Sequence, residues 1–154
     1  MDINEIRNGN YVVSRGELTR VRGLRTDTED PCVLCENSDV WVPVETLEPV
    51  GLNKDILETN GFRMSDDKSY GIFKSVFKPF GDGNIDEFED YIAIDLVVRP
   101  ACLVKHQYVV NTNRKGMSIK DKSFNGEILY AHELQNIMYE CGCTKKLIID
   151  RSRW

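Results

Sequence analysis

Residues 130–139 read Y-A-H-E-L-Q-N-I-M-Y, and their apolar side chains recur at the period of an α-helix. At about 100° per residue, a core-facing stripe occupies an arc about 100° wide. The residues that fall in this arc are Tyr130, Leu134, Ile137, Met138 and Cys141. Gly142 follows directly, at the position where a left-handed residue commonly ends a helix. We therefore predict a helix that covers a sheet near the C-terminus.

The opposite arc of this helix carries four polar side chains, which we call the polar ridge: His132, Gln135, Asn136 and Tyr139. Three of them follow i, i+4, i+7 spacing and share one line along the helix. A water-facing line is more often built from Glu and Lys. Imidazole and amide groups suit hydrogen bonds to neighbouring backbone, and they equally suit a ligand or a partner. Both interpretations stay open, and the ridge is our candidate binding site.

The helix also begins a zinc-protease motif with His132-Glu133. That motif needs a second His four residues after the first, and Asn136 stands there instead. The chain has one other histidine, His106, and it has no nucleophile elbow and no glycine-rich phosphate loop. A Cys–His pair is made by folding rather than by spacing, so a hydrolase centred on His132 stays open as an alternative. We assign no catalytic residue.

Four thiols form two close pairs, Cys32 with Cys35 and Cys141 with Cys143. Structural zinc commonly uses two such pairs, but the second usually has at least two residues between its thiols. Cys32 and Cys35 also lie in a predicted strand with opposite parity, so they point to opposite faces. This pattern favours inert thiols, and we expect neither a metal nor a cofactor.

Residues 82–89, D-G-N-I-D-E-F-E, resemble part of a calcium-binding loop. With Gly83 at position 6 of such a loop, positions 1 and 3 become Lys78 and Phe80, which cannot supply the required oxygen ligands. We predict an acidic hairpin loop instead.

The composition is that of a globular protein, with 41% hydrophobic and 29% charged residues among 154. No apolar run approaches the ~20 residues that span a membrane. The N-terminus is acidic and lacks the basic and apolar regions of a signal peptide. We therefore expect a cytoplasmic protein without membrane contact.

The net charge of −5 argues against broad nucleic-acid binding, which depends on neutralising phosphates. The charge is uneven, however, because residues 101–154 carry 9 basic and 5 acidic groups. Eight of these basic residues form two clusters: Arg114, Lys115, Lys120 and Lys122, then Lys145, Lys146, Arg151 and Arg153. Nucleic acid therefore remains an alternative partner.

Residues 1–50 predict a small β module. Strand-forming segments lie at 11–14, 18–25, 32–36 and 39–44, with Arg15-Gly16 as a tight turn. Four or five short strands of this kind predict a bent antiparallel sheet or SH3-like barrel. That architecture implies no particular function.

Residues 51–154 predict an α+β lobe that packs with the β module as one compact unit. Asn53 is a suitable N-cap for a helix at 54–59. Further strands are expected at 69–77, 91–99, 102–110 and 147–149, with a polar loop at 111–125. The fold class is therefore α+β, with one or two helices covering a second antiparallel sheet.

Three phrases of the chain occur in a fixed order: I-R-N-G-N-Y-V at 6–12, L-E-P at 47–49 leading to N-G-F at 60–62, and Y-A-H-E-L-Q-N at 130–136. They resemble the opening, central and closing phrases of a family of small proteins from gut anaerobes, their phages and mobile elements. The resemblance spans nearly the whole chain. It implies an N-terminal β module, a middle helix and a C-terminal helix, and it implies no established activity. The two cysteine pairs lie outside the family's pattern.

Taken together, the sequence predicts a non-enzymatic binding or accessory protein whose partner is another protein. The first alternative is a nucleic-acid-binding accessory protein that uses the basic last third. The second is the hydrolase centred on His132.

Overall fold

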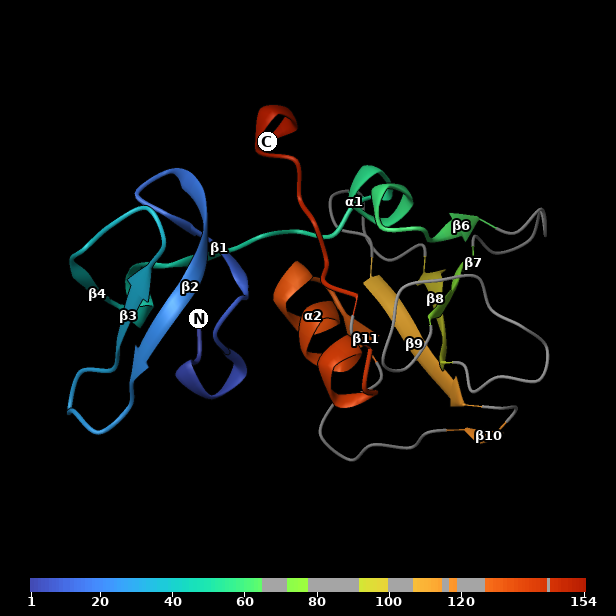
Figure 1. The fold of residues 1–154 in the computed structure, drawn as a ribbon, viewed down its shortest axis with the longest axis horizontal. Helices are drawn as coiled ribbons and strands as arrows, with labels where there is room; N and C mark the ends of the chain where they lie inside the picture. Colours follow the sequence, from blue (N-terminus) through green and yellow to red (C-terminus); the bar gives the residue numbers. More distant parts are fainter. Residues whose placement is uncertain (65–71, 78–91, 100–106, 115–116, 119–126, 144) are drawn as a thin grey trace. The chain divides into compact units, whose positions relative to one another are not determined.

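The computed structural model describes residues 1–64, 72–77, 92–99, 107–114, 117–118, 127–143 and 145–154, and its fold is α+β (Figure 1). Contacts divide the chain into two compact units. Unit 1 comprises Met1–Gly51, Tyr130–Asn136 and Ile149–Trp154, and unit 2 comprises Leu52–Leu129 and Ile137–Ile148. Each unit is therefore built from segments that are not consecutive in the sequence. No helix in the described part of the chain is long and apolar enough to cross a membrane.

Unit 1 contains a five-stranded antiparallel sheet with the order β4-β3-β2-β1-β5. Its strands are β1 (Tyr11–Ser14), β2 (Glu17–Arg25), β3 (Cys32–Cys35), β4 (Trp41–Pro43) and β5 (Glu48–Pro49). Two 3-10 turns precede the first and last strands, η1 (Ile3–Glu5) and η2 (Val44–Thr46), and a third, η3 (Arg151–Arg153), lies near the C-terminus. The strands predicted at 11–14, 18–25, 32–36 and 39–44 are confirmed to within two residues at each end.

The turn between β1 and β2 contains Arg15 and Gly16. Ser14 pairs with Glu17, so only these two residues connect the strands. Both have positive φ, 54° at Arg15 and 80° at Gly16. Two-residue hairpins favour this left-handed backbone because it matches the twist of the strands. Asn, Asp and Gly are usual at the first position, and a residue such as Arg loses about 1 kcal/mol there.

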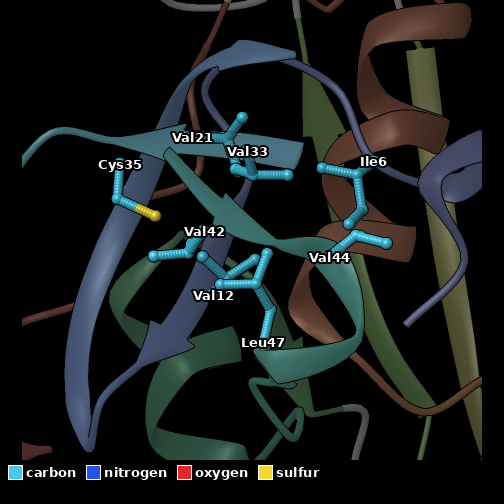
Figure 2. Packing of buried hydrophobic residues seen from close by; sticks show 8 residues of the cluster. All are labelled: Ile6, Val12, Val21, Val33, Cys35, Val42, Val44 and Leu47. Carbon is cyan, nitrogen blue, oxygen red and sulfur yellow. The ribbon is translucent and has the colours of Figure 1, made fainter. Parts of the chain in front are cut away.

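The core of unit 1 is a cluster of buried side chains contributed by every strand of the meander (Figure 2). Its members are Ile6, Val12, Val21, Val33, Cys35, Val42, Val44 and Leu47. Figure 2 shows Cys35 at one edge of the cluster, and Ile6 and Val44 at the other. Each fully buried aliphatic side chain of this size contributes about 1.5–3 kcal/mol. Strand β3 alternates as predicted, with Cys35 buried and Cys32 half-buried.

The indole ring of Trp41 on β4 lies close to Gly23 and Arg25 on β2. The register of β2 against β3 shifts between Val21 and Gly23, which marks a β-bulge. A Cβ atom added to Gly23 would lie 3.1 Å from a ring carbon of Trp41. The guanidinium of Arg25 lies 4.2 Å from the centre of the same ring. Gly23 therefore provides the space that the indole occupies.

Unit 2 begins with the short helix α1 (Lys54–Thr59). The Asn53 side chain accepts from the Ile56 N–H at 2.8 Å, which confirms the predicted N-cap. The helix ends at Thr59 with Asn60 as its C-cap, and Gly61 follows with a φ of 88°. The N–H of Phe62 then donates to the Leu57 carbonyl at 3.0 Å, and the Phe62 side chain is fully buried.

The sheet of unit 2 has the order β10-β9-β8-β7-β6, with β11 paired to β9. Its strands are β6 (Arg63–Met64), β7 (Ile72–Phe77), β8 (Ile92–Arg99), β9 (Gln107–Arg114), β10 (Met117–Ser118) and β11 (Glu127–Ile128). All the pairings are antiparallel, as predicted.

The predicted polar loop at 111–125 is wrong in its first part, because β9 continues through Arg114 and returns in β10. Asn111, Thr112 and Asn113 pair with β8. Backbone groups make these ladder bonds, so polar side chains do not prevent them. The remaining parts of these predictions, at residues 69–71, 91, 102–106, 115–116 and 119–125, lie outside the described residues.

Helix α2 (Ala131–Glu140) is the predicted C-terminal helix. At its start, the Tyr130 N–H donates to the Glu133 carboxylate at 2.9 Å, as in a capping box. At its end, Gly142 has φ 82° and the Cys143 N–H donates to the Met138 carbonyl at 2.9 Å. The predicted apolar stripe is confirmed at four positions, since Leu134, Ile137, Met138 and Cys141 are buried and Tyr130 is half-buried.

The short strand predicted at 147–149 is wrong, because this segment is bound by a side chain instead of a sheet. Within unit 2, the Asn60 amide accepts from the Ile148 N–H at 2.7 Å and donates to the Ile148 carbonyl at 2.7 Å. Its Nδ2 also donates to the Ile56 carbonyl at 2.7 Å. One buried side chain therefore satisfies backbone groups that a strand partner would otherwise satisfy.

Candidate functional site

Gln135 of the polar ridge hydrogen-bonds the backbone of the N-terminal segment. Its Oε1 accepts from the Tyr11 N–H at 2.9 Å, and its Nε2 donates to the Gly9 carbonyl at 3.0 Å. The primary amide thus pairs with two backbone groups that lie two residues apart, as a neighbouring strand would. Both residues belong to unit 1.

Asn136 extends this set of bonds. Its Nδ2 donates to the Glu5 carbonyl at 2.7 Å, and its Oδ1 accepts from the Asn10 side chain at 3.1 Å. Asn10 is buried, and its own Oδ1 accepts from the Arg7 N–H at 2.7 Å. The backbone-bonding interpretation therefore describes what Gln135 and Asn136 do in this fold.

His132 is not on a water-facing line, which corrects that part of the prediction. Only 2% of the residue is exposed, and its ring stacks on Tyr130 with 5.8 Å between centroids. Neither ring nitrogen has a hydrogen-bond partner among the described residues. Burial lowers the pKa of His132 to about 4, while the nearby Glu5 carboxylate opposes the shift and the N-terminal amino group adds to it. The ring is therefore neutral at pH 7.

Tyr139, the last member of the ridge, is 73% exposed. It lies in the part of α2 that belongs to unit 2, whereas the other three belong to unit 1. The ridge thus contains two residues that bond the N-terminal segment, one buried ring and one exposed ring. Tyr139 is therefore the exposed member of this candidate binding site.

A hollow of about 230 Å³ lies in unit 1 between two hairpin turns. The β1–β2 turn contributes Ser14, Arg15 and Glu17, and the β3–β4 turn contributes Asn37, Ser38 and Val40. Cys35 and Val42 complete the lining. Both also belong to the core cluster, so the hollow borders that core at Cys35 and Val42, which Figure 2 labels. We call this feature the turn hollow.

The charged groups of the turn hollow differ in how they are satisfied. The Glu17 carboxylate accepts from the Asn37 side chain at 3.0 Å. Arg15 has no hydrogen-bond or ion-pair partner among the described residues. Two other arginines of unit 1 are paired, Arg20 with Glu36 at 3.0 Å and Arg22 with Asp39 at 3.0 Å. Arg15 therefore supplies an unpaired cation at the rim.

Two lining residues of the hollow, Cys35 and Val42, belong to the buried core. Burial raises the pKa of the Cys35 thiol, and a side-chain hydrogen bond with Ser14 only partly offsets this effect. Cys35 is thus a neutral thiol beside Val42. Val40 stands at the edge with 55% of its surface exposed. This site cannot be recognised in the sequence, because its residues come from two separate turns. The one local signal was Arg at a turn position where Asn or Gly is usual.

The other candidates from the sequence are the cysteine pairs, the acidic segment, His106 and the basic clusters. Cys32, Cys35, Cys141 and Cys143 are free thiols, and no three potential ligands converge as a metal site within the described ranges. Burial and the neighbouring Cys141 raise the pKa of Cys143 to about 12. The acidic segment at 82–89 and His106 lie outside the described residues, as do Lys115, Lys120 and Lys122.

No family model, curated protein or solved structure matches this chain. The resemblance to the family from gut anaerobes and their phages rests on the three phrases alone. In unit 1, the opening and closing phrases lie together, since Gln135 and Asn136 bond the backbone or side chains of Gly9, Asn10 and Tyr11. The opening and closing phrases are thus hydrogen-bonded to each other.

Proposed function

We propose that this chain is a non-catalytic binding protein that acts through contact with another protein, and that the turn hollow is its contact site. The observation that carries this proposal is the combination of an open cavity, an exposed Val40 and the unpaired Arg15 at one end of the β module. Apolar surface beside an arginine is typical of the centre of a protein interface.

The polar ridge is a weaker contact site than the turn hollow. Gln135 and Asn136 each already donate one hydrogen bond and accept one on unit 1. A partner would find only the second N–H and the second oxygen lone pair of each amide unused by these bonds. Tyr139 remains a candidate second contact, because exposed tyrosine supplies apolar area and a hydroxyl at little entropic cost.

Capture of partners from the host tests the proposal. The intact protein and its Val40→Asp variant serve as bait, and Ile148→Asp is the matched control, because it places the same charge on another exposed aliphatic residue. We expect Val40→Asp to lose a partner that the wild type and Ile148→Asp both retain. Equal capture by all three would exclude the turn hollow as the contact site. Thermal unfolding checks that the variants are folded.

A nucleic-acid-binding accessory protein is the second candidate. Arg25 stacked on Trp41 favours it, because guanidinium and indole groups together bind unpaired bases. Arg20 and Arg22 lie on the same strand as Arg25. Their ion pairs with Glu36 and Asp39 argue against nucleic-acid binding, because both cations are already neutralised. A shift assay with single-stranded DNA and RNA at low salt decides, and Trp41→Ala must weaken any binding that this surface makes.

The hydrolase alternative is less well supported. A general base must reach the proton that it abstracts, and the buried His132 ring has no open path in the described part of the chain. The SH3-like architecture stays a proposal, supported by the return of β5 to β1 after a four-stranded meander. Membership in the phage-associated family is likewise a proposal, which rests on the three sequence phrases. Residence in the cytoplasm also stays a proposal.

A further inference from the structure

Resting on the proposed function, we infer that the turn hollow receives the C-terminal residue of a partner polypeptide. The α-carboxylate of that residue pairs with Arg15, its N–H faces the Glu17 carboxylate, and its apolar side chain contacts Val40 and Val42. The inference stands on the size, charge and lining of the hollow.

The size limits the occupant to about one residue. Pockets for drug-sized ligands are about 300–1,000 Å³, and the turn hollow has about 230 Å³. A single amino-acid residue with a medium-sized side chain fits such a space, whereas a folded helix or strand does not.

The positive charge of Arg15 favours an occupant that carries a carboxylate. Arg15 is the one charged lining residue without a hydrogen-bond partner in the described part of the chain, since Glu17 accepts from Asn37. A guanidinium presents paired N–H donors in a plane, and a carboxylate matches them with two oxygens. An amide or a hydroxyl would satisfy only part of this donor set.

The backbone of the hairpin fixes the position of Arg15 at the rim. Its φ of 54° is a conformation that Asn and Gly adopt more easily. The two-residue hairpin imposes this conformation on its first turn residue. Here, the short hairpin holds the Cα atom of Arg15 beside Ser14 and Glu17.

Glu17 favours a chain end over an acidic side chain. In a C-terminal residue, an N–H lies only one Cα atom away from the carboxylate. The occupant therefore presents a donor to Glu17 and an acceptor to Arg15 within the same residue. An Asp or Glu side chain places its carboxylate farther from its own N–H. Capture of a chain terminus by groups at a turn is a known mode of peptide recognition.

Proton–nitrogen correlation spectra of the labelled full-length protein test the inference with four probes. N-acetyl-L-leucine carries the carboxylate, the N–H and the apolar side chain. N-acetyl-L-leucinamide lacks the carboxylate, and L-leucine replaces the amide with an ammonium group. N-acetyl-L-aspartic acid α-amide carries its carboxylate on the side chain. The reporting signals are the backbone amides of Ser14, Gly16, Asn37, Ser38 and Val40.

We expect N-acetyl-L-leucine to shift these amides saturably, with at least a tenfold lower Kd than the leucinamide and the aspartate probe. Arg15→Gln is expected to raise this Kd at least tenfold. The control is Arg63→Gln, which removes the same charge from an arginine of unit 2 that bonds the Glu58 carbonyl, and it is expected to leave the Kd within twofold. Equal binding of the leucinamide, tighter binding of the aspartate probe, tighter binding of L-leucine, or shifts confined to other amides would each overturn the inference.

The two proposals fail in distinguishable ways. If Val40→Asp loses a partner while N-acetyl-L-leucine leaves the reporting amides unchanged, the turn hollow binds a partner but not its chain end. If N-acetyl-L-leucine binds as expected and Val40→Asp retains every partner, the carboxylate site stands and the protein contact lies elsewhere.

Discussion

Asn10 and Asn136, separated by 126 positions in the sequence, are joined side chain to side chain by a hydrogen bond of 3.1 Å. Around this bond, the amides of Gln135 and Asn136 satisfy the backbone at Glu5, Gly9 and Tyr11. The first half of α2 therefore belongs to unit 1 by specific polar bonds as well as by contact. Substitutions at Gln135 or Asn136 are therefore expected to weaken the hydrogen bonds that hold the N-terminal segment.

The first prediction concerns Asn136→Asp. The substitution preserves shape but replaces the Nδ2 donor with an oxygen that faces the Glu5 carbonyl. We expect the free energy of unfolding to fall by about 1–3 kcal/mol, the usual cost of a lost partner. Urea unfolding at pH 7 measures the change. Asn8→Asp, on the exposed neighbouring turn, is the control and should change stability by less than about 0.5 kcal/mol.

The second prediction is a pH dependence from His132. Its pKa is about 4 in the folded protein and 6.5 in its ordinary state. Between these values, the unfolded chain binds a proton that the folded protein does not, so stability falls as the pH falls from about 6.5 to about 4. The difference corresponds to about 3 kcal/mol at most.

Urea unfolding of wild type and His132→Leu at several pH values between 7 and 4 measures this effect. The variant removes an unpartnered polar ring, so we expect it to be nearly neutral at pH 7 and relatively more stable than wild type at pH 4.5. Parallel curves for the two proteins over this range would show that His132 does not titrate in the fold.

The third prediction concerns Asn60→Asp in unit 2. The carboxylate keeps the acceptor for the Ile148 N–H but loses both donations, to the carbonyls of Ile56 and Ile148. Because Asn60 is buried, we expect a loss of about 2–3 kcal/mol. Asn53→Asp is a close control, since Asp caps a helix as well as Asn does. Chemical denaturation of both variants gives the comparison.

The fourth prediction separates stability from binding at Arg15. Asn tolerates the left-handed backbone of this turn better than Arg does, so Arg15→Asn should raise the free energy of unfolding by about 0.5–1 kcal/mol. The same variant should lose the carboxylate probe. Denaturation and the spectral titration together test this, and a variant that is less stable and still binds N-acetyl-L-leucine would contradict both expectations.

The fifth prediction concerns Gly23→Ala beneath the Trp41 ring. The new methyl group would lie 3.1 Å from the ring, so either the indole moves or the strand does. We expect a loss of about 1 kcal/mol and a changed near-ultraviolet dichroism signal. Gly51→Ala is the control, because its Cβ meets nothing within 4 Å and the backbone needs no positive φ there. That variant should be neutral or slightly more stable.

The sequence by itself determined the elements that depend on local chemistry. The N-cap of α1 at Asn53, the glycine ends of both helices and the apolar stripe of α2 all follow from short-range rules. The strands of unit 1 followed from β-branched runs between turn residues. These features need only neighbours within a few positions.

Only the tertiary structure decided what the polar side chains do. Asn111–Asn113 look like a loop in sequence, yet they pair with β8 because a ladder uses backbone groups. Asn60 replaces a predicted strand, His132 is buried without a described partner, and Asn136 bonds Glu5 and Asn10. The turn hollow is made by two turns about 20 residues apart in the chain. Such roles depend on which distant groups folding brings within hydrogen-bonding distance, and no periodicity encodes that.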